Sequence, residues 1–163
     1  MSPQTNPFPH DPDRRAIWDM LVGRDIDAYL AADWRRTEGD FVAAGFFGLH
    51  GHHAANPDSW RLAFPDLATY RDEWLRQAAE TARTAYAEPL RDALFKATQM
   101  QHIDVAGNQA VAHKKFDGSI LRADGGTDRL NWQTLYFCSR RDGVWKIAGF
   151  VGYLPFPMGG AAS

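Results

Sequence analysis

The strongest constraint in this sequence is a change of pattern near residue 90, where helical spacing gives way to an alternation of period two. Four alternating runs follow, at 90–104, 109–121, 130–141 and 144–153. The breaks between them hold glycine beside Asn or Asp, residue types that tolerate the positive φ of tight turns. The pattern therefore predicts a meander of long antiparallel strands.

Two helical patterns open the chain. Asp11 and Pro12 supply an N-cap and a first-turn proline, and Gly23 stands where a left-handed residue would end the first helix. Asp25 is then placed to cap a second helix, whose apolar stripe covers residues 26–34.

A short strand and a third helix precede the meander. Residues 46–50 read as the strand, and 51–65 as a long loop without a regular element. Asp66 caps the longest predicted helix, which runs to about Tyr86. Helices first and strands later predict an α+β fold.

The size and charge of the chain limit its class. Its 163 residues fit one domain, with 1–10 as an extended lead, 11–153 as the folded part and 154–163 as a tail. The net charge is −2, and the basic and acidic residues are scattered among one another along the chain. We therefore expect neither nucleic acid nor a membrane as a partner. The single cysteine, Cys138, and the absence of a signal-like or membrane-spanning run favour a cytoplasmic setting.

Two stretches carry a resemblance to a known family. Tyr29-Leu30-Ala31-Ala32-Asp33-Trp34 resembles the second-helix segment of the nuclear transport factor 2-like (ketosteroid-isomerase-like) proteins, and Arg141-Asp142-Gly143-Val144-Trp145-Lys146-Ile147 resembles their closing hairpin. The resemblance covers about 11–153 and is to the polyketide-cyclase-like branch of this family. It implies a cone, in which a curved antiparallel sheet wraps around a long helix, and a homodimer. Folds of this kind host enzymes, carriers and adaptors.

The acid pair of the ketosteroid isomerases has no counterpart at the matching positions. Their general base is a carboxylate on the first strand, whereas residues 47–50 contain no acid and His50 is the nearest ionisable group. Their oxyanion-binding Asp corresponds to Phe137. The resemblance therefore disfavours a steroid-isomerase mechanism.

Scytalone dehydratase, another protein with this cone, combines His, Asp and Tyr groups around its pocket. This chain could imitate that composition with Asp33, with His50 or His113, and with Tyr136 or Tyr29. We take Asp33, His50 and Tyr136 as the catalytic candidates.

Asp33 has two interpretations. A continuous helix would put its carboxylate on the apolar face, seven residues after Ile26, where burial would raise its pKa and suit acid/base work. Alternatively the helix breaks there and Asp33 caps the turn at 34–37, the more favoured of the two.

His50, His52 and His53 form the densest imidazole cluster. A strand would put His50 and His52 on one face, but a metal site needs a third ligand, and Asp58 is the only acid in the loop. No familiar ligand spacing occurs, so no metal site is predicted. His50 keeps a claim as a pocket acid or base near neutral pH.

Strand alternation groups His113 with Gln109 and Val111, and His102 with Met100 and Thr98. The pattern does not decide which face of the sheet either histidine occupies.

The six Trp and ten Phe favour an aromatic cavity for a small, mostly apolar ligand. Trp60, in the irregular loop, is a candidate pocket lid. The ligand-binding candidates are Trp34, Trp60, Tyr70, Trp74, Gln99, His113 and Trp132. Any chemistry would be acid/base isomerisation, dehydration or cyclisation, and no cofactor is expected because no phosphate-binding glycine motif occurs. The alternative is a non-catalytic module that dimerises or binds a protein partner.

Overall fold

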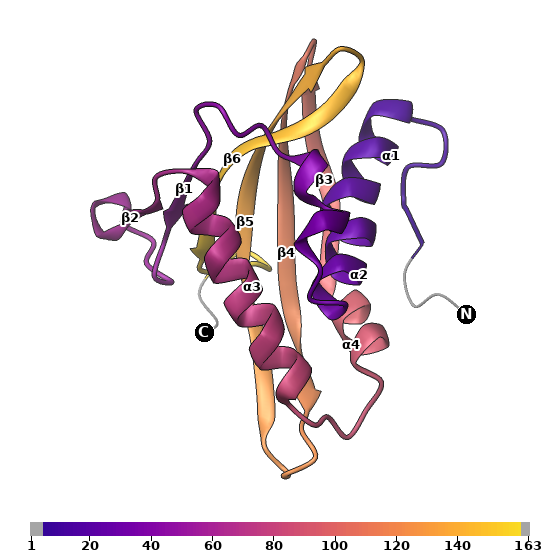
Figure 1. The fold of residues 1–163 in the computed structure, drawn as a ribbon, viewed down its shortest axis with the longest axis vertical. Coiled ribbons are helices and arrows are strands. Elements are labelled where there is room, and N and C mark those ends of the chain that lie inside the picture. Colours follow the sequence, from indigo (N-terminus) through magenta and orange to yellow (C-terminus); the bar gives the residue numbers. More distant parts are fainter. Residues whose placement is uncertain (1–4, 161–163) are drawn as a thin grey trace.

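The computed structural model describes residues 5–160, so residues 1–4 of the predicted lead and 161–163 of the predicted tail lie outside the described residues. A six-stranded sheet in the order β2-β1-β6-β5-β4-β3 forms one layer (Figure 1). Its strands are β1 Phe47–His50, β2 Arg61–Phe64, β3 Thr98–Ala106, β4 Gln109–Leu121, β5 Thr127–Arg141 and β6 Val144–Leu154. Adjacent strands pair antiparallel except β1 and β6, which are parallel.

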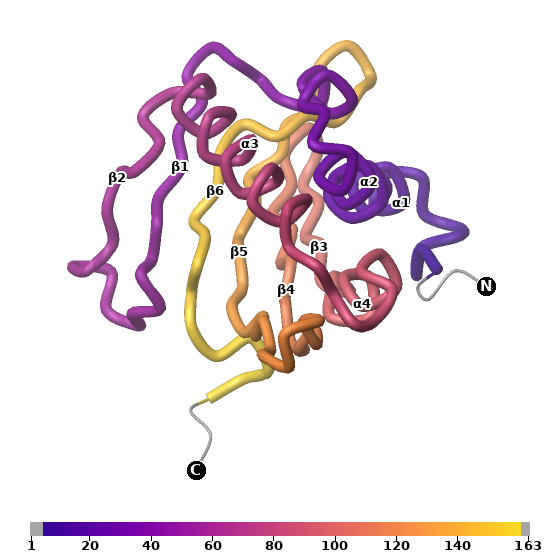
Figure 2. Tube along the Cα trace, turned by 60° about the horizontal axis from the view of Figure 1, so that its bottom comes forward, coloured from indigo at the N-terminus to yellow at the C-terminus, as the bar shows by residue number. Residues whose placement is uncertain are grey.

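The helices lie along one face of this sheet, and the sheet curves around them (Figure 2). They are α1 Pro12–Trp18, a π-helix Asp19–Arg24, α2 Asp25–Leu30, α3 Leu67–Arg83 and α4 Leu90–Ala97, with short 3₁₀ turns at Trp34–Arg36, Glu38–Asp40 and Pro57–Ser59. Asp66 caps α3 by accepting a hydrogen bond from the Thr69 N–H at 2.8 Å, as predicted. The predicted α+β fold, with its curved sheet and N-terminal helices, is confirmed.

Within residues 5–160, no helix combines the length and the apolar character needed to cross a membrane.

The structure corrects the predicted strand that begins at residue 90 and the predicted loop at 51–65. Residues 90–97 form helix α4 rather than the start of a strand. Pro89 precedes this helix, and the small side chains of Ala93 and Ala97, four residues apart, are buried. An ideal Cβ on Gly118 of β4 would lie 2.7 Å from the Ala97 Cβ, so the helix packs directly on a strand that has no side chain there. The predicted loop at 51–65 also contains β2, which pairs with β1.

The first helix does not end at Gly23. Instead the π-helix joins α1 to α2 without a left-handed residue at Gly23, because the backbone there stays helical. Asp25 therefore caps nothing: the cap position of α2 is Arg24, which makes no side-chain capping hydrogen bond. The carboxylate of Asp25 is free to point toward the sheet.

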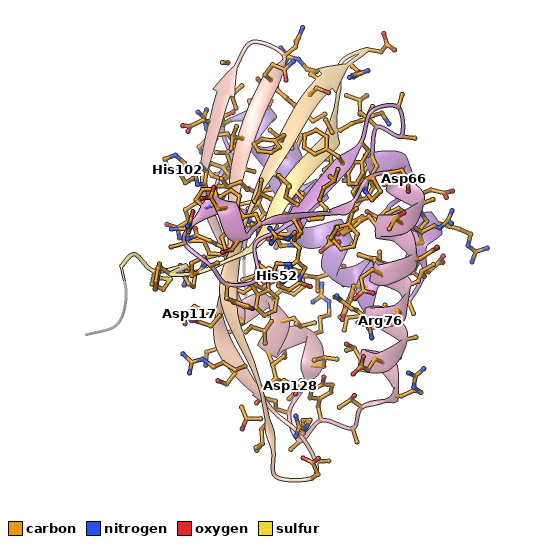
Figure 3. The ribbon with its side chains drawn as sticks, turned by 90° about the vertical axis from the view of Figure 1, so that its left-hand side faces the viewer. His52, Asp66, Arg76, His102, Asp117 and Asp128 are labelled. Carbon is orange, nitrogen blue, oxygen red and sulfur yellow. The ribbon has the colours of Figure 1, made fainter. Side chains whose placement is uncertain are left out.

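A β-bulge in β3 changes which side chains share a face. The register runs Gln99 opposite Lys115 and then His102 opposite His113, so β3 holds one more residue than β4 between these pairs. As a result Met100 is buried beneath the helices while His102 is exposed. Figure 3 shows His102 on the side of the sheet away from α3, which carries Arg76. The predicted grouping of His102 with Met100 is wrong for this reason.

Candidate functional site

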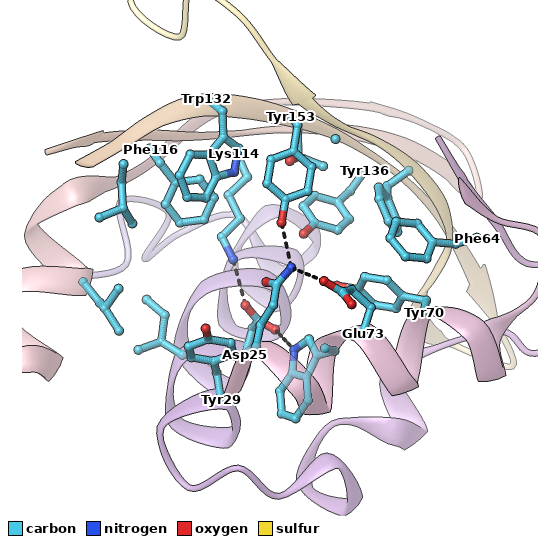
Figure 4. Close-up of a pocket in the computed structure, with 18 residues that line it drawn as sticks. Asp25, Tyr29, Phe64, Tyr70, Glu73, Lys114, Phe116, Trp132, Tyr136 and Tyr153 are labelled. Carbon is cyan, nitrogen blue, oxygen red and sulfur yellow. Dashed lines mark hydrogen bonds and ion pairs between the residues drawn. The ribbon is translucent and has the colours of Figure 1, made fainter. Parts of the chain in front are cut away.

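A cavity of about 200 Å³ lies between helices α2 and α3 and the concave face of β4, β5 and β6 (Figure 4). Aromatic and aliphatic side chains make up most of its wall, among them Phe64, Phe116, Trp132 and Phe150. A small number of polar groups converge on it from opposite sides. This is the arrangement typical of a small-molecule site.

An ion pair between a buried ammonium and a partly exposed carboxylate joins the two sides of the cavity. The Lys114 side chain on β4 is only 1% exposed, and its Nζ donates to the Asp25 Oδ2 at 3.0 Å. The same ammonium donates to the main-chain oxygen of Leu21 at 2.5 Å. The Asp25 Oδ1 accepts from the Trp74 Nε1 at 3.4 Å. Each charged group thus has a partner, as burial requires.

The π-helix ends directly before Asp25. In a regular α-helix the Asp25 N–H would donate to the Leu21 oxygen. Here it donates to the Val22 oxygen, and the Leu21 oxygen accepts from Lys114. Single π turns of this kind are frequent at functional sites because they re-aim the side chains that follow.

Two tyrosines form the polar end of the cavity. Burial raises the pKa of both Tyr70 and Tyr136 well above the usual value for tyrosine, and the nearby Asp25 charge adds to the effect. The interaction between the two hydroxyls raises the pKa of Tyr70 and lowers that of Tyr136, a smaller effect than burial. Both hydroxyls therefore stay protonated at neutral pH and can donate hydrogen bonds to a ligand.

A hydrogen-bonded chain spans the rim of the cavity. The Gln77 Nε2 donates to the Glu73 Oε1 at 3.0 Å and to the Tyr153 hydroxyl at 3.1 Å (Figure 4). Arg76 holds the pKa of Glu73 below its usual value through a hydrogen bond to that carboxylate. Tyr153 has a φ of 55°, a left-handed conformation that costs energy for a residue with a side chain. This strained backbone accompanies a ring that lines the cavity.

The structure brings four of the predicted site residues to the cavity wall: Tyr70, Trp74, Trp132 and Tyr136. The other predicted residues, which are Asp33, Trp34, His50, Trp60, Gln99 and His113, are not part of its lining. Asp33 and His50 therefore do not meet at the cavity.

Asp33 takes the capping role. Helix α2 ends at Leu30 and Ala32 has a φ of 50°, so the helical spacing that would bury Asp33 is lost. Its carboxylate accepts from the Arg35 N–H at 3.2 Å and pairs with the Arg35 guanidinium, which lowers the pKa of Asp33. Trp34, next along the chain, is buried in the core and stacks on Phe41 with 5.0 Å between ring centroids.

His50 lies one ring away from the cavity. Its imidazole stacks on Tyr153 with 4.2 Å between ring centroids, and its Nδ1 accepts from the His52 N–H at 3.0 Å. Partial burial lowers the pKa of His50, with smaller contributions from His52 and His53.

Trp60 does not cover the cavity as the predicted lid would. Its Nε1 donates to the oxygen of Ala54, in the same segment between β1 and β2, at 2.9 Å.

Gln99 and His113 lie on the outer face of the sheet. Gln99 pairs with Lys115 of β4, and Lys115 and His113 alternate along that strand with the buried residues Ala112 and Lys114. Burial lowers the pKa of His113, and His102 contributes to the shift.

Sequence reasoning missed Asp25, Lys114 and Glu73. A signal was present for Lys114, because it falls on the same alternation as Ala110 and Ala112, the apolar face of β4. Asp25 looked like a helix cap, and Glu73 like a solvent-facing residue of the long helix.

We expect the stability of the fold to fall with pH above about 10, where unfolded tyrosine titrates. The unfolded chain loses tyrosine protons there, whereas buried Tyr70 and Tyr136 keep theirs, because their folded pKa values are raised. Each contributes a slope of up to about 1.4 kcal/mol per pH unit. Chemical unfolding between about pH 9 and pH 11 should therefore show that the free energy of unfolding falls less steeply with pH in the Tyr70→Phe/Tyr136→Phe variant than in the native chain. Equal slopes in the two proteins would contradict this assignment.

Comparison with known proteins gives structural matches at low sequence identity. No known family model matches the sequence, and no curated protein matches it. An NTF2-like superfamily protein from Salmonella enterica is 15% identical with a TM-score of 0.54, and the match covers 90% of this chain and 94% of that one. An NTF2-like protein of unknown function from Pseudomonas putida is 15% identical with a TM-score of 0.55, covering 87% and 86%.

A third structure, from Novosphingobium aromaticivorans, is named as a candidate aromatic ring hydroxylase. It is 14% identical with a TM-score of 0.56, and the match covers 86% of this chain and 87% of that chain. At such identities the likeness concerns the arrangement of the backbone. The curved sheet, the helices on its concave face and these matches agree: the chain has the nuclear transport factor 2-like fold.

Proposed function

We propose that this protein binds a small, mostly apolar molecule. The molecule is about the size of one ring and carries an oxygen atom that accepts hydrogen bonds. The volume of about 200 Å³ supports this size. An apolar protein cavity of about 150 Å³ is large enough for benzene. One structural neighbour is named for chemistry on aromatic rings, which agrees with this class of ligand.

The observation that carries the proposal is the pair of protonated hydroxyls at the end of an aromatic cavity. Tyr70 and Tyr136 can donate to a carbonyl or phenolate oxygen of the ligand, while Phe116 and Trp132 contact its ring. A ligand without that oxygen would leave the buried hydroxyls without a partner in the ligand, which costs binding energy. The site therefore favours a ring with an oxygen over its hydrocarbon counterpart.

The matched pair acetophenone and α-methylstyrene tests this preference, because the two molecules have nearly the same shape and only the first has a carbonyl. We expect acetophenone to bind more tightly, and Tyr136→Phe to weaken its binding about five- to tenfold, the value of one hydrogen bond. Quenching of tryptophan fluorescence measures both affinities, since Trp74 and Trp132 line the cavity.

Tyr86→Phe is the matched control for this experiment. The Tyr86 hydroxyl donates to Asp128 at 2.7 Å, outside the cavity, so its loss should leave acetophenone binding unchanged. Equal affinity for the two ligands, or an equal loss in both variants, would contradict the proposed recognition.

The same site supports a proton transfer that needs no cofactor. Asp25 presents its carboxylate to the cavity, close enough to Tyr70 and Tyr136 for its charge to affect their pKa values. Asp25 would take a proton from the carbon next to the ligand carbonyl. The C–H electron pair would move to form an enolate, and the tyrosine hydroxyls would donate to its oxygen. Return of the proton to another carbon would complete an isomerisation.

Deuterium exchange into the methyl group of acetophenone measures this step directly. We expect the protein in D₂O to accelerate the exchange over buffer, and Asp25→Asn to abolish the acceleration because an amide is not a base. Asp27→Asn is the control, since the Asp27 carboxylate is on the same helix but pairs with Arg91 at the surface. Exchange at the buffer rate, with acetophenone bound, would mean that the site binds its ligand without this chemistry.

A second candidate function, dimerisation, is favoured by the outer face of the sheet. Val111, Phe137, Gly149 and Phe47 are consecutive partners across β4, β5, β6 and β1. They make an apolar row on the face opposite the cavity, and Phe47 is 43% exposed. A row of this kind is suited to pack against a second copy of the chain.

Light scattering tests the dimer. We expect the mass of two chains for the native sequence and a shift toward one chain for Phe47→Asp, because a charge in an apolar interface is costly to bury. Val144→Asp is the control, since Val144 is also exposed but lies where the β5–β6 hairpin turns. A native mass of one chain would rule out this interface.

A further inference from the structure

Three metal-ligating side chains meet on the outer face of the sheet, away from the cavity. His102 and Asp104 on β3 and His113 on β4 each offer one ligand atom, and these atoms lie within 4.8 Å of one another. The His102 Nε2 is 3.2 Å from the Asp104 Oδ2, and the two imidazole rings are 4.4 Å apart between centroids. Such spacing allows one ion to contact all three.

All three residues are on paired strands of the sheet rather than in a loop. His102 lies directly opposite His113 in the β3–β4 ladder, and Asp104 follows two residues along the same strand, on the same face. The β-bulge between Gln99 and His102 is what puts the two histidines on one face. With the register that precedes the bulge, His102 would point to the opposite face from His113.

We propose that His102, Asp104 and His113 bind one divalent transition-metal ion of the zinc class. Two imidazole nitrogens and a carboxylate oxygen are the donors that such ions prefer, whereas Mg²⁺ and Ca²⁺ favour sites made of oxygen alone. Three protein ligands leave a further position to water, as in open zinc sites. The sequence predicts no metal site because these residues follow no familiar spacing, and only strand pairing brings them together.

The charges around the site are compatible with a cation. Asp104 supplies a negative charge that would offset part of the charge of the ion. Lys115, close enough to His113 for its charge to affect the imidazole, opposes binding in part. Both imidazoles and the carboxylate are accessible, since the His102 and Asp104 side chains are 61% and 72% exposed. An ion can therefore reach the ligands without opening of the fold.

The loop histidines are the rival metal site. His50 already accepts a hydrogen bond at its Nδ1 from the His52 N–H, and the two rings lie 4.2 Å apart between centroids. Among residues 5–160, no set of three His, Cys, Asp or Glu ligands includes His50, His52 or His53. The geometry therefore favours the outer-face residues over the loop histidines as the metal site.

The consequence of binding would be a clamp between β3 and β4. Strand β3 is at the edge of the sheet, and its pairing with β4 is interrupted by the bulge. An ion held by both strands just beyond the bulge would join the edge strand to its neighbour. Because the ion binds the folded ladder, it should also raise the unfolding temperature.

Metal titration of the untagged full chain, stripped with a chelator, tests the proposal. We expect one Zn²⁺ per chain by calorimetry and visible absorption bands of coordinated Co²⁺. His102→Ala/His113→Ala should weaken Zn²⁺ binding at least about tenfold, since it removes two of three ligands. The matched control is His52→Ala/His53→Ala, which removes two exposed histidines from the rival loop and should bind Zn²⁺ as tightly as the native chain.

Two further measurements keep the test independent of folding. Asp104→Asn removes a ligand charge from an exposed position and should weaken Zn²⁺ binding without changing the unfolding temperature of the metal-free protein. Bound Co²⁺ should shift the imidazole NMR signals of His102 and His113 rather than those of the loop. Absence of Zn²⁺ binding by the native chain, loss of binding in the loop variant alone, or Co²⁺ shifts confined to the loop histidines would each overturn the proposal.

Discussion

The interaction that links the two walls of the cavity is the ion pair between buried Lys114 and partly exposed Asp25. An ammonium that is 1% exposed is costly to bury unless its donors are satisfied, and here the Asp25 carboxylate and the Leu21 oxygen satisfy two of them. The pair ties strand β4 to the helices at the π turn. Removing one partner from such a pair typically costs about 3–5 kcal/mol, because the other charge stays buried.

The same burial gives the cavity its chemical character. Low exposure raises the pKa values of Tyr70 and Tyr136, which keeps two donors protonated beside a carboxylate and an ammonium. Aromatic rings from β4, β5 and β6 surround this polar end. The raised pKa values keep both hydroxyls protonated at neutral pH, where they can donate hydrogen bonds.

Much of the fold could be predicted because it rests on local patterns. The meander and its turns follow from alternation and from glycine beside Asn or Asp, and the Asp66 cap follows from the residue itself. The prediction is wrong at 90–97, where Ala93 and Ala97 suit a helix as well as a strand and Gly118 of β4 supplies the space that selects the helix. Four aromatic residues of the site were also predicted, since large rings on inward positions line any cavity in such a sheet.

The sequence by itself determined the N-terminal helices, the long helix after Asp66 and the antiparallel meander, because spacing and turn residues act within a few positions. Tertiary structure decided which polar side chains meet. A single π turn aims Asp25 at Lys114, and a single bulge turns His102 toward His113. Each inserts one residue into a regular repeat and so changes the face on which the following side chains lie. Such insertions are selected by packing between distant segments, which is why local patterns did not bring Asp25 to Lys114 or His102 to His113.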